Sequence, residues 1–271
     1  AFDLFLDQVE EQLADTKLIL MIDEFEVLED QVMKGNLRSE IFEFFRHMVQ
    51  HRQKMNFLLS GTHQITDYTK WYRSVFFHIA QHYRISQLTP RGAEELIQRP
   101  VEGFLVYEPL SIKKIHQLTA DQPYLIHLIC KAIVDYCNEL GKGFVTINDV
   151  NSVLHEVMQT GQFHFDWIWD QIKPEERVAL AAIAEGGQEE GRWLSFSEIE
   201  NLYRRYQIPS KQEYISDALK KLIEVDVVET ESITRHKVTF SAQRFRIPVG
   251  LTRRWLLEEH PLNVVRKEMH H

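Results

Sequence analysis

The chain has 271 residues, of which 44% are hydrophobic and 26% charged, and its formal net charge is −9. This composition is ordinary for a folded globular protein, and the length predicts about two domains. The acidic balance disfavours a protein that binds nucleic acid mainly through a basic surface. No apolar run approaches the roughly 18 residues of a membrane span, so the sequence predicts no membrane contact.

Cysteine usage predicts the compartment. Cys130 and Cys137 lie within an apolar helical pattern, two turns apart on one helix face, which is too far for a disulfide between them. Free core thiols are typical of a reducing compartment. Residues 1–7 include acids rather than the basic start of a signal peptide. The sequence therefore predicts a cytoplasmic protein.

Helical and strand patterns alternate in residues 1–90. Residues 2–15 and 36–51 show helical spacing of apolar residues. Three short apolar runs indicate strands. The first covers residues 18–22, and the second begins at Met55 and ends in small polar residues by position 62. The third covers residues 83–88. This order predicts an α/β core with a parallel sheet. The first run lacks alternation, so we expect that strand to be buried on both faces.

Two acids directly follow the first strand. The run from Leu18 to Ile22 ends at once in Asp23 and Glu24. Ligands of open parallel sheets bind beyond the carboxyl ends of the strands. One carboxylate there would hold Mg²⁺ and the other would polarise a water, which are two roles that hydrolysis of a nucleoside triphosphate needs. The alternative is a core strand followed by an acidic loop.

The rest of the chain predicts two further parts joined by an aromatic segment. Residues 91–160 form an all-helical unit, centred on a helix over 122–139 that has Pro123 in its first turn; a further helix is expected over 147–159. Residues 161–173 are expected to be an aromatic linker docked onto its neighbours, because exposed patches of that size are rare. Three helices and a β-hairpin in residues 174–261 predict a winged helix-turn-helix.

This combination resembles the P-loop ATPases of the AAA+/STAND type, and its layout is most similar to archaeal STAND and origin-recognition-type ATPases. Residues 18–24 resemble their Walker B strand. The resemblance implies that Asp23 coordinates Mg²⁺ and that Glu24 is the general base. Residues 57–62 resemble the strand that ends in a polar sensor, which implies that Ser60 or Thr62 lies near the γ-phosphate of ATP.

Two other segments carry the resemblance further along the chain. Residues 118–126 resemble the lid motif, which implies that Pro123 lies against the nucleotide base; Asp121 stands where the family usually has glycine. Residues 245–256 resemble the segment that closes the winged helix in bacterial members. The resemblance thus implies a nucleotide-binding core, a helical lid and a winged helix in that order.

One family motif does not occur in the sequence. No G-x-x-x-x-G-K-[ST] loop is present, although its amides and lysine hold the phosphates in the family. We therefore expect these residues alone to bind nucleotide weakly or not at all, and to expose apolar sheet edges where a strand is missing. We expect that they are part of a longer polypeptide; the alternative is a family member that has lost its nucleotide site.

Three functions follow as hypotheses. The first is an ATP-dependent molecular switch in signal transduction, in which Mg²⁺-dependent hydrolysis is reported by the winged helix to a protein partner or a neighbouring domain. The second is a DNA-binding regulator whose recognition helix is 211–224, disfavoured because residues 168–260 hold slightly more acids than bases. The third is a nucleotide-inactive protein-interaction module. A homo-oligomer is left open.

Overall fold

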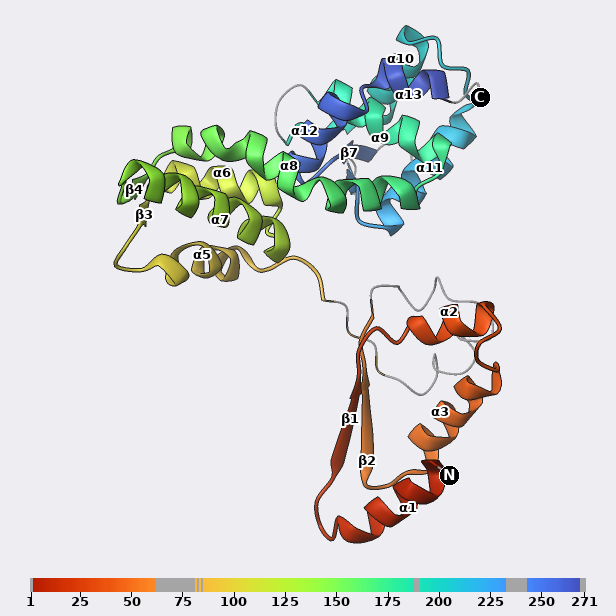
Figure 1. The fold of residues 1–271 in the computed structure, drawn as a ribbon. Helices are drawn as coiled ribbons and strands as arrows, with labels where there is room; N and C mark the ends of the chain where they lie inside the picture. Colours follow the sequence, from red (N-terminus) through yellow and green to blue (C-terminus); the bar gives the residue numbers. More distant parts are fainter. Residues whose placement is uncertain are drawn as a thin grey trace. The chain divides into compact units, whose positions relative to one another are not determined.

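The chain divides into two units, Ala1–Arg84 and Ile85–His271 (Figure 1). The computed structural model describes residues 2–61, 81, 83, 85–187, 191–232 and 243–268. Within these ranges, no helix is both long enough and apolar enough to cross a membrane.

The N-terminal unit has α/β structure. Its elements are α1 (Phe2–Gln12), β1 (Leu18–Ile22), α2 (Val27–Met33), α3 (Glu40–His51) and β2 (Met55–Leu59). The two strands pair in parallel, with Leu18 opposite Met55 and Ile22 opposite Leu59, which confirms the predicted parallel arrangement for this pair. In Figure 1, α1 lies at the end where the strands begin, and α2 lies at the end where they finish.

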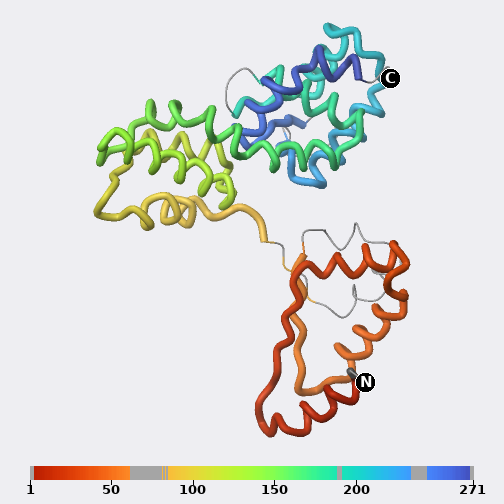
Figure 2. The backbone as a smooth tube through the Cα atoms, viewed as in Figure 1, coloured from red at the N-terminus to blue at the C-terminus, as the bar shows by residue number. Residues whose placement is uncertain are grey.

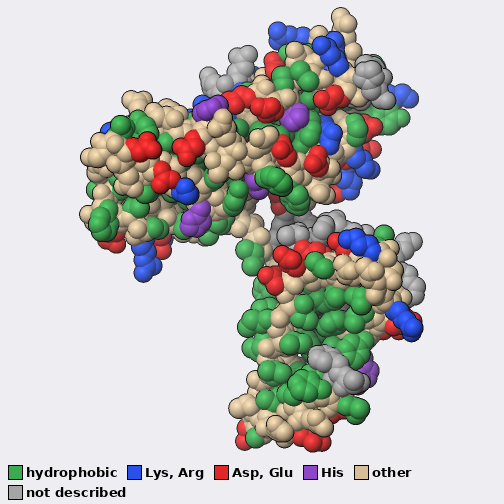
Figure 3. Space-filling model, in the orientation of Figure 1, with side chains coloured by type: hydrophobic (Ala, Val, Ile, Leu, Met, Phe, Trp, Pro, Cys, Tyr) green, Lys and Arg blue, Asp and Glu red, His purple; other side chains and the backbone are tan. Residues whose placement is uncertain are grey.

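The two faces of this strand pair differ. Leu18, Phe57 and Leu59 pack on the side of the helices, around buried side chains of α1 and α3. On the other face, Ile19 and Met21 expose 56% and 69% of their surface. The expectation of burial on both faces is therefore wrong for this strand, since the described helices of this unit pack on its opposite face. Hydrophobic side chains also gather on the face of this unit seen in Figure 3.

The third predicted strand, residues 83–88, is not formed in the part of it that the structure describes. Tyr83 and residues 85–88 lie in no helix or strand, and Ile85 is 96% exposed. A strand needs a neighbouring strand to which it can hydrogen-bond, and the composition of a segment does not show whether such a neighbour is present. The amide of Leu88 instead donates to the carbonyl of Asp121 at 3.0 Å.

Arg52 joins the end of α3 to α1. Its guanidinium pairs with the carboxylates of Asp3, of Asp7 at 2.6 Å and of Glu10 at 3.1 Å, and only 7% of its side chain is exposed. Burial opposes the charged form, but hydrogen bonds to Asp3, Glu10 and Asp7 outweigh it and raise the pKa of Arg52 above its ordinary value. One cation thus offsets three acids that share a face of α1.

We expect Arg52→Ala to lower the free energy of unfolding of the N-terminal unit by about 2 kcal/mol, because three neighbouring carboxylates lose their shared counter-ion. Urea unfolding followed by amide exchange in α1 measures this change. Arg52→Lys is the matched control, since it keeps the charge but not the forked donors, and should lose less. Equal stability of the Ala variant and the parent would contradict a stabilising role for the ion pairs of Arg52.

The C-terminal unit begins with a group of helices around one central helix. Its elements are α5 (Pro90–Gln98), the short 3₁₀ helix η1 (Arg99–Val101), β3 (Val106–Tyr107), α6 (Pro109–Thr119), α7 (Pro123–Leu140) and β4 (Phe144–Val145). Strands β3 and β4 pair in parallel. Helix α7 buries Leu125, Ile126, Ile129 and Ile133, which confirms its predicted place in the core.

Helix α8 (Ile147–Gln171) runs from this group into the next, as Figure 2 shows. The helix predicted over 147–159 continues through the aromatic segment, so residues 161–171 are helical rather than a separate linker. Phe165 and Trp169 are buried, whereas Phe163 is 89% exposed. The spacing of four between Phe165 and Trp169 is the helical signal that the aromatic composition obscured.

The second group holds the remaining elements. They are α9 (Pro174–Gly186), β5 (Leu194–Ser195), α10 (Phe196–Arg205), α11 (Gln212–Glu224), β6 (Glu229–Ser232), β7 (Gln243–Arg246), α12 (Gly250–Glu259) and α13 (Leu262–Glu268). The strands form an antiparallel sheet in the order β5-β7-β6. The helices and the strand pair expected here are present, and β5 is an additional strand of only two residues, too short for a pattern to reveal.

An aromatic cluster joins α8 to α12. The ring of Trp169 stacks on that of His260 at 4.0 Å between centroids and meets the edge of Trp255 at 5.8 Å. Burial lowers the pKa of His260 below its ordinary value of 6.5, against the opposite effect of Glu268 and Glu259. The neutral imidazole is therefore the form that suits the folded state.

This shift predicts a pH dependence of stability. The unfolded chain protonates His260 near the ordinary pKa of 6.5, whereas the folded chain does so only at lower pH. Stability is therefore full above that value and falls as the pH drops below it. We expect His260→Phe to flatten the fall in melting temperature between about pH 7.5 and about pH 5.5. His155→Gln, at an exposed position of α8, should keep the parent slope; an unchanged slope in His260→Phe would contradict the assignment.

Candidate functional site

The carboxyl ends of β1 and β2 lie side by side. The ladder of hydrogen bonds continues past both strands: the amide of Ser60 donates to the carbonyl of Ile22, and the amide of Phe25 donates to the carbonyl of Ser60, each at 3.0 Å. Because the strands are parallel and in register, Asp23 and Ser60 leave the sheet at the same edge.

The side chains of Asp23 and Ser60 are in direct contact. The Ser60 hydroxyl donates to Asp23 Oδ1 at 2.6 Å, and the Glu24 amide donates to the same oxygen at 3.0 Å. These two hydrogen bonds, that of Ser60 first, lower the pKa of the exposed Asp23 carboxyl. Asp23 is therefore ionised at neutral pH, and carboxylate and hydroxyl oxygens are ligands that Mg²⁺ accepts.

Glu24 occupies a turn of unusual backbone conformation. Its φ is +50°, in the left-handed region, which costs a non-glycine residue about 1 kcal/mol or more. The next residue, Phe25, is only 2% exposed and meets Phe45 edge-on at 5.3 Å between ring centroids. Phe25 is thus buried at this turn, whereas Asp23 and Glu24 are both exposed.

The predicted site residues fall into two groups. The structure brings Asp23, Glu24 and Ser60 together in the N-terminal unit, whereas Pro123 belongs to the C-terminal unit. Thr62 lies outside the described residues. In the part of the chain that the structure describes, no group of three or more His, Cys, Asp and Glu residues could hold a metal ion.

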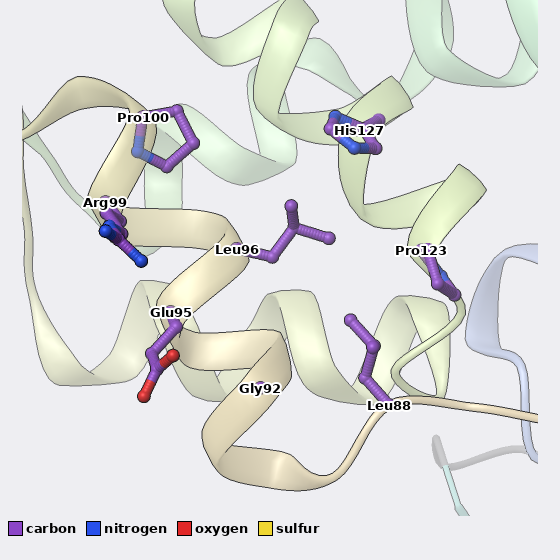
Figure 4. Close-up of a pocket in the computed structure, with 8 residues that line it drawn as sticks. All are labelled: Leu88, Gly92, Glu95, Leu96, Arg99, Pro100, Pro123 and His127. Carbon is purple, nitrogen blue, oxygen red and sulfur yellow. The ribbon is translucent and has the colours of Figure 1, made fainter. Parts of the chain in front are cut away.

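Pro123 lines a cavity of about 490 Å³ between α5 and α7. The lining residues are Leu88, Gly92, Glu95, Leu96, Arg99, Pro100, Pro123 and His127. Figure 4 shows the side chains of Leu88 and Leu96 projecting towards the space in front of Pro123, while that of Glu95 points away from it. The cavity is thus mainly apolar at its centre. The sequence pattern pointed to Pro123 but not to the residues of α5 that line the other side of the cavity.

Asp121, which stands where the resemblance leads one to expect glycine, adopts the conformation that favours glycine. Its φ is +61°, directly after Ala120 at +46°. The carboxylate meets His116 Nδ1 at 2.5 Å, and the Asp121 amide donates to the Thr119 hydroxyl at 3.3 Å. These bonds offset the backbone cost, so aspartate fits the turn that precedes Pro123.

Two substitutions separate backbone strain from hydrogen bonding at this turn. We expect Asp121→Ala to lower the free energy of unfolding by about 2 kcal/mol, because the left-handed backbone remains while the bond to His116 is lost. Asp121→Gly removes both the strain and the bond, so its effect should be within about 0.5 kcal/mol of zero. Urea midpoints of the three proteins measure the difference, and equal losses in both variants would contradict this account.

Basic side chains of the last group of elements pair within the chain. Lys220 contacts Asp217 at 2.7 Å, and Lys221 pairs with Glu224, all on α11. Arg246 donates twice to Glu229 and lies over the Trp193 ring at 4.4 Å. These pairings reduce the positive field that a DNA-reading helix and wing would need. Arg235 and Lys237, two further basic residues between β6 and β7, lie outside the described residues.

Solved structures similar to this chain include origin-recognition proteins. The ORC2 protein of Aeropyrum pernix, in ADPNP–ADP complexes, aligns with a TM-score of 0.44 and 16% identity over 98% of this chain and 68% of that one. The ORC1 protein of Aeropyrum pernix in complex with DNA gives 0.40 and 14%, over 94% and 68%. Drosophila ORC bound to DNA gives 0.40 and 12%, over 95% and 64%.

Searches of protein-family models and of curated proteins find no match. None of these three structural similarities reaches a TM-score of 0.5.

Proposed function

We propose that the chain is part of an ATP-dependent molecular switch of the AAA+/STAND type. The observation that carries the proposal is the contact between Ser60 and Asp23, with Glu24 beside them, at the carboxyl end of two parallel strands. An ionised aspartate, an adjacent glutamate and a hydroxyl at one sheet edge are the groups that Mg²⁺-dependent hydrolysis requires of the protein at this position.

The residues present fit a magnesium–nucleotide complex. Asp23 is exposed, and its lowered pKa keeps it charged, while Mg²⁺ in phosphate chemistry takes one or two carboxylates together with phosphate oxygens. When bound, Mg-ATP would supply the phosphoanhydride bond and the charge that polarises it. The phosphate-binding loop is not in this sequence, so we propose that another part of the polypeptide provides it.

Each residue of the site then has a distinct task. Ser60 fixes the orientation of the Asp23 carboxylate through its hydrogen bond of 2.6 Å. Glu24 accepts a proton from the attacking water, a role open to it because its side chain is at the surface and the anchored Phe25 fixes the turn. In the C-terminal unit, taken by itself, we propose that the apolar cavity lined by Pro123 binds a nucleotide base.

The elements from α9 to β7 support a winged helix as the output module. Three helices with a strand between the first two, followed by two strands that complete an antiparallel sheet, are the parts of such a module. The pairing of Lys220 and Lys221 with acids of their own helix favours a protein partner or a neighbouring domain over DNA. A switch whose output is a protein contact is therefore the function we propose.

The test is Glu24→Gln in the full product of the native gene. We expect nucleotide binding to persist and hydrolysis to fall by about 10²- to 10⁴-fold, because glutamine has nearly the same shape but cannot take the proton. Binding is measured with a fluorescent ATP analogue in Mg²⁺, and turnover by phosphate release.

Asp30→Asn, at an exposed acid of α2, is the matched control and should behave as the parent. Hydrolysis that survives Glu24→Gln would show that the base assignment is wrong. A parent protein that neither binds nor hydrolyses ATP would favour a nucleotide-inactive interaction module instead. Tight, salt-dependent binding of duplex DNA would favour the regulator.

A further inference from the structure

A second acid of the same turn, Glu26, lies against the segment that follows β2. The chain bends at Asp23 and Glu24. The Glu26 carboxylate lies against Gly61, and its Oε2 atom is buried. A Cβ built on Gly61 would lie 2.2 Å from that oxygen and 3.1 Å from Glu26 Cδ. The carboxylate therefore occupies the space that any other residue at position 61 would need.

Gly61 directly follows Ser60, the residue that contacts Asp23. The path of the chain at Ser60 is set by two backbone bonds, to Ile22 and from Phe25. Both bonds join Ser60 to the end of β1 and the turn that follows it. The Glu26 carboxylate adds a contact to Gly61, the next residue of the segment. A segment held at successive residues has little freedom to rotate Ser60 away from Asp23.

Glu26 is also the residue from which α2 begins. Its carbonyl accepts from the amides of Glu29 at 3.0 Å and Asp30 at 3.3 Å. The same residue thus touches the segment after β2 through its side chain and the first turn of α2 through its backbone. A displacement at Gly61 would reach α2 through this one residue.

We propose that Glu26 is a positioning residue, which holds the Ser60–Gly61 segment against the turn formed by Asp23 and Glu24 through a contact that only glycine at position 61 permits. Its consequence for hydrolysis rests on the proposed function, but the contact itself does not. Because the atom nearest to the built Cβ is the end of a flexible side chain, Gly61→Ala displaces the carboxylate without a backbone clash. The substitution therefore removes the contact while sparing the fold.

The experiment is a double-substitution cycle on the full chain, with Gly61→Ala, Glu26→Ala and both together. Amide hydrogen exchange of Phe25 and Ser60 reports the two bonds at the strand ends. We expect each single variant to lose about tenfold in protection at these amides, and the double variant to lose no more than either, because all three lack the same contact. The Leu18 amide, which donates to Lys54 at the other end of the pair, should keep its protection.

Glu26→Gln is the conservative variant and should retain protection, because the amide has the same shape. Losses that add in the double variant, or unchanged protection at Phe25 and Ser60 in both single variants, would overturn the proposal. A loss at Leu18 as large as that at Phe25 would show general destabilisation and would also overturn it.

Kinetic measurements on the full product of the native gene test whether the contact between Glu26 and Gly61 affects turnover. There Gly61→Ala should lower kcat about tenfold with little change in KM, since the positions of catalytic groups change and the binding surface does not. Unchanged kcat together with reduced protection would overturn the catalytic role of the positioning. Absence of ATP hydrolysis in the parent would refute the proposed function, and the exchange cycle would still decide whether Glu26 positions the segment.

Discussion

The parallel register of β1 and β2 is the constraint on which the candidate site depends. Side chains alternate along a strand, so a slip of one residue would turn Ile19 and Met21 inward and carry Ser60 away from Asp23. The register is held at both ends of the pair: the Leu18 amide donates to the Lys54 carbonyl at 2.8 Å, and the Ser60 amide donates to the Ile22 carbonyl. The position of the hydroxyl on the carboxylate is thus a consequence of strand pairing.

Two different interactions keep that pair in place against its helices. At the start of the strands, Arg52 binds three acids of α1. At their end, Phe25 is buried with Phe42 under α3. The ionic interaction depends on pairing among partly exposed groups, while the aromatic one removes apolar surface from water. The turn of Asp23 and Glu24 is therefore anchored by the interaction that charge screening by salt does not weaken.

The sequence predicted the elements whose patterns are long or regular. The parallel pair, α7 and the helices of residues 174–259 follow from apolar periodicity, and Asp23, Glu24 and Ser60 meet because parallel strands end at one edge. The segment 83–88 was wrongly expected to be a strand, because its composition cannot show whether a neighbour exists to pair with it. The contact of Glu26 with Gly61 could not be predicted, since it depends on the bend at Glu24, where a non-glycine residue has a φ of +50°.

The backbone at Glu24 distinguishes this turn from the others in the chain. Six described non-glycine residues have positive φ: Ala14, Glu24, Ala120, Asp121, Gln207 and Asp226. Five of them follow a helix within two residues, where a left-handed residue satisfies the last carbonyls and is expected.

Glu24 follows a strand instead, and no helix end explains its conformation. Its cost is met by the burial of Phe25 and by the bond from its own amide to Asp23 Oδ1. The same bond orients the carboxylate, so the strained residue and the ionised residue depend on each other. Backbone strain that serves no capping purpose and holds two acids at a sheet edge is the kind of feature that concentrates at functional sites.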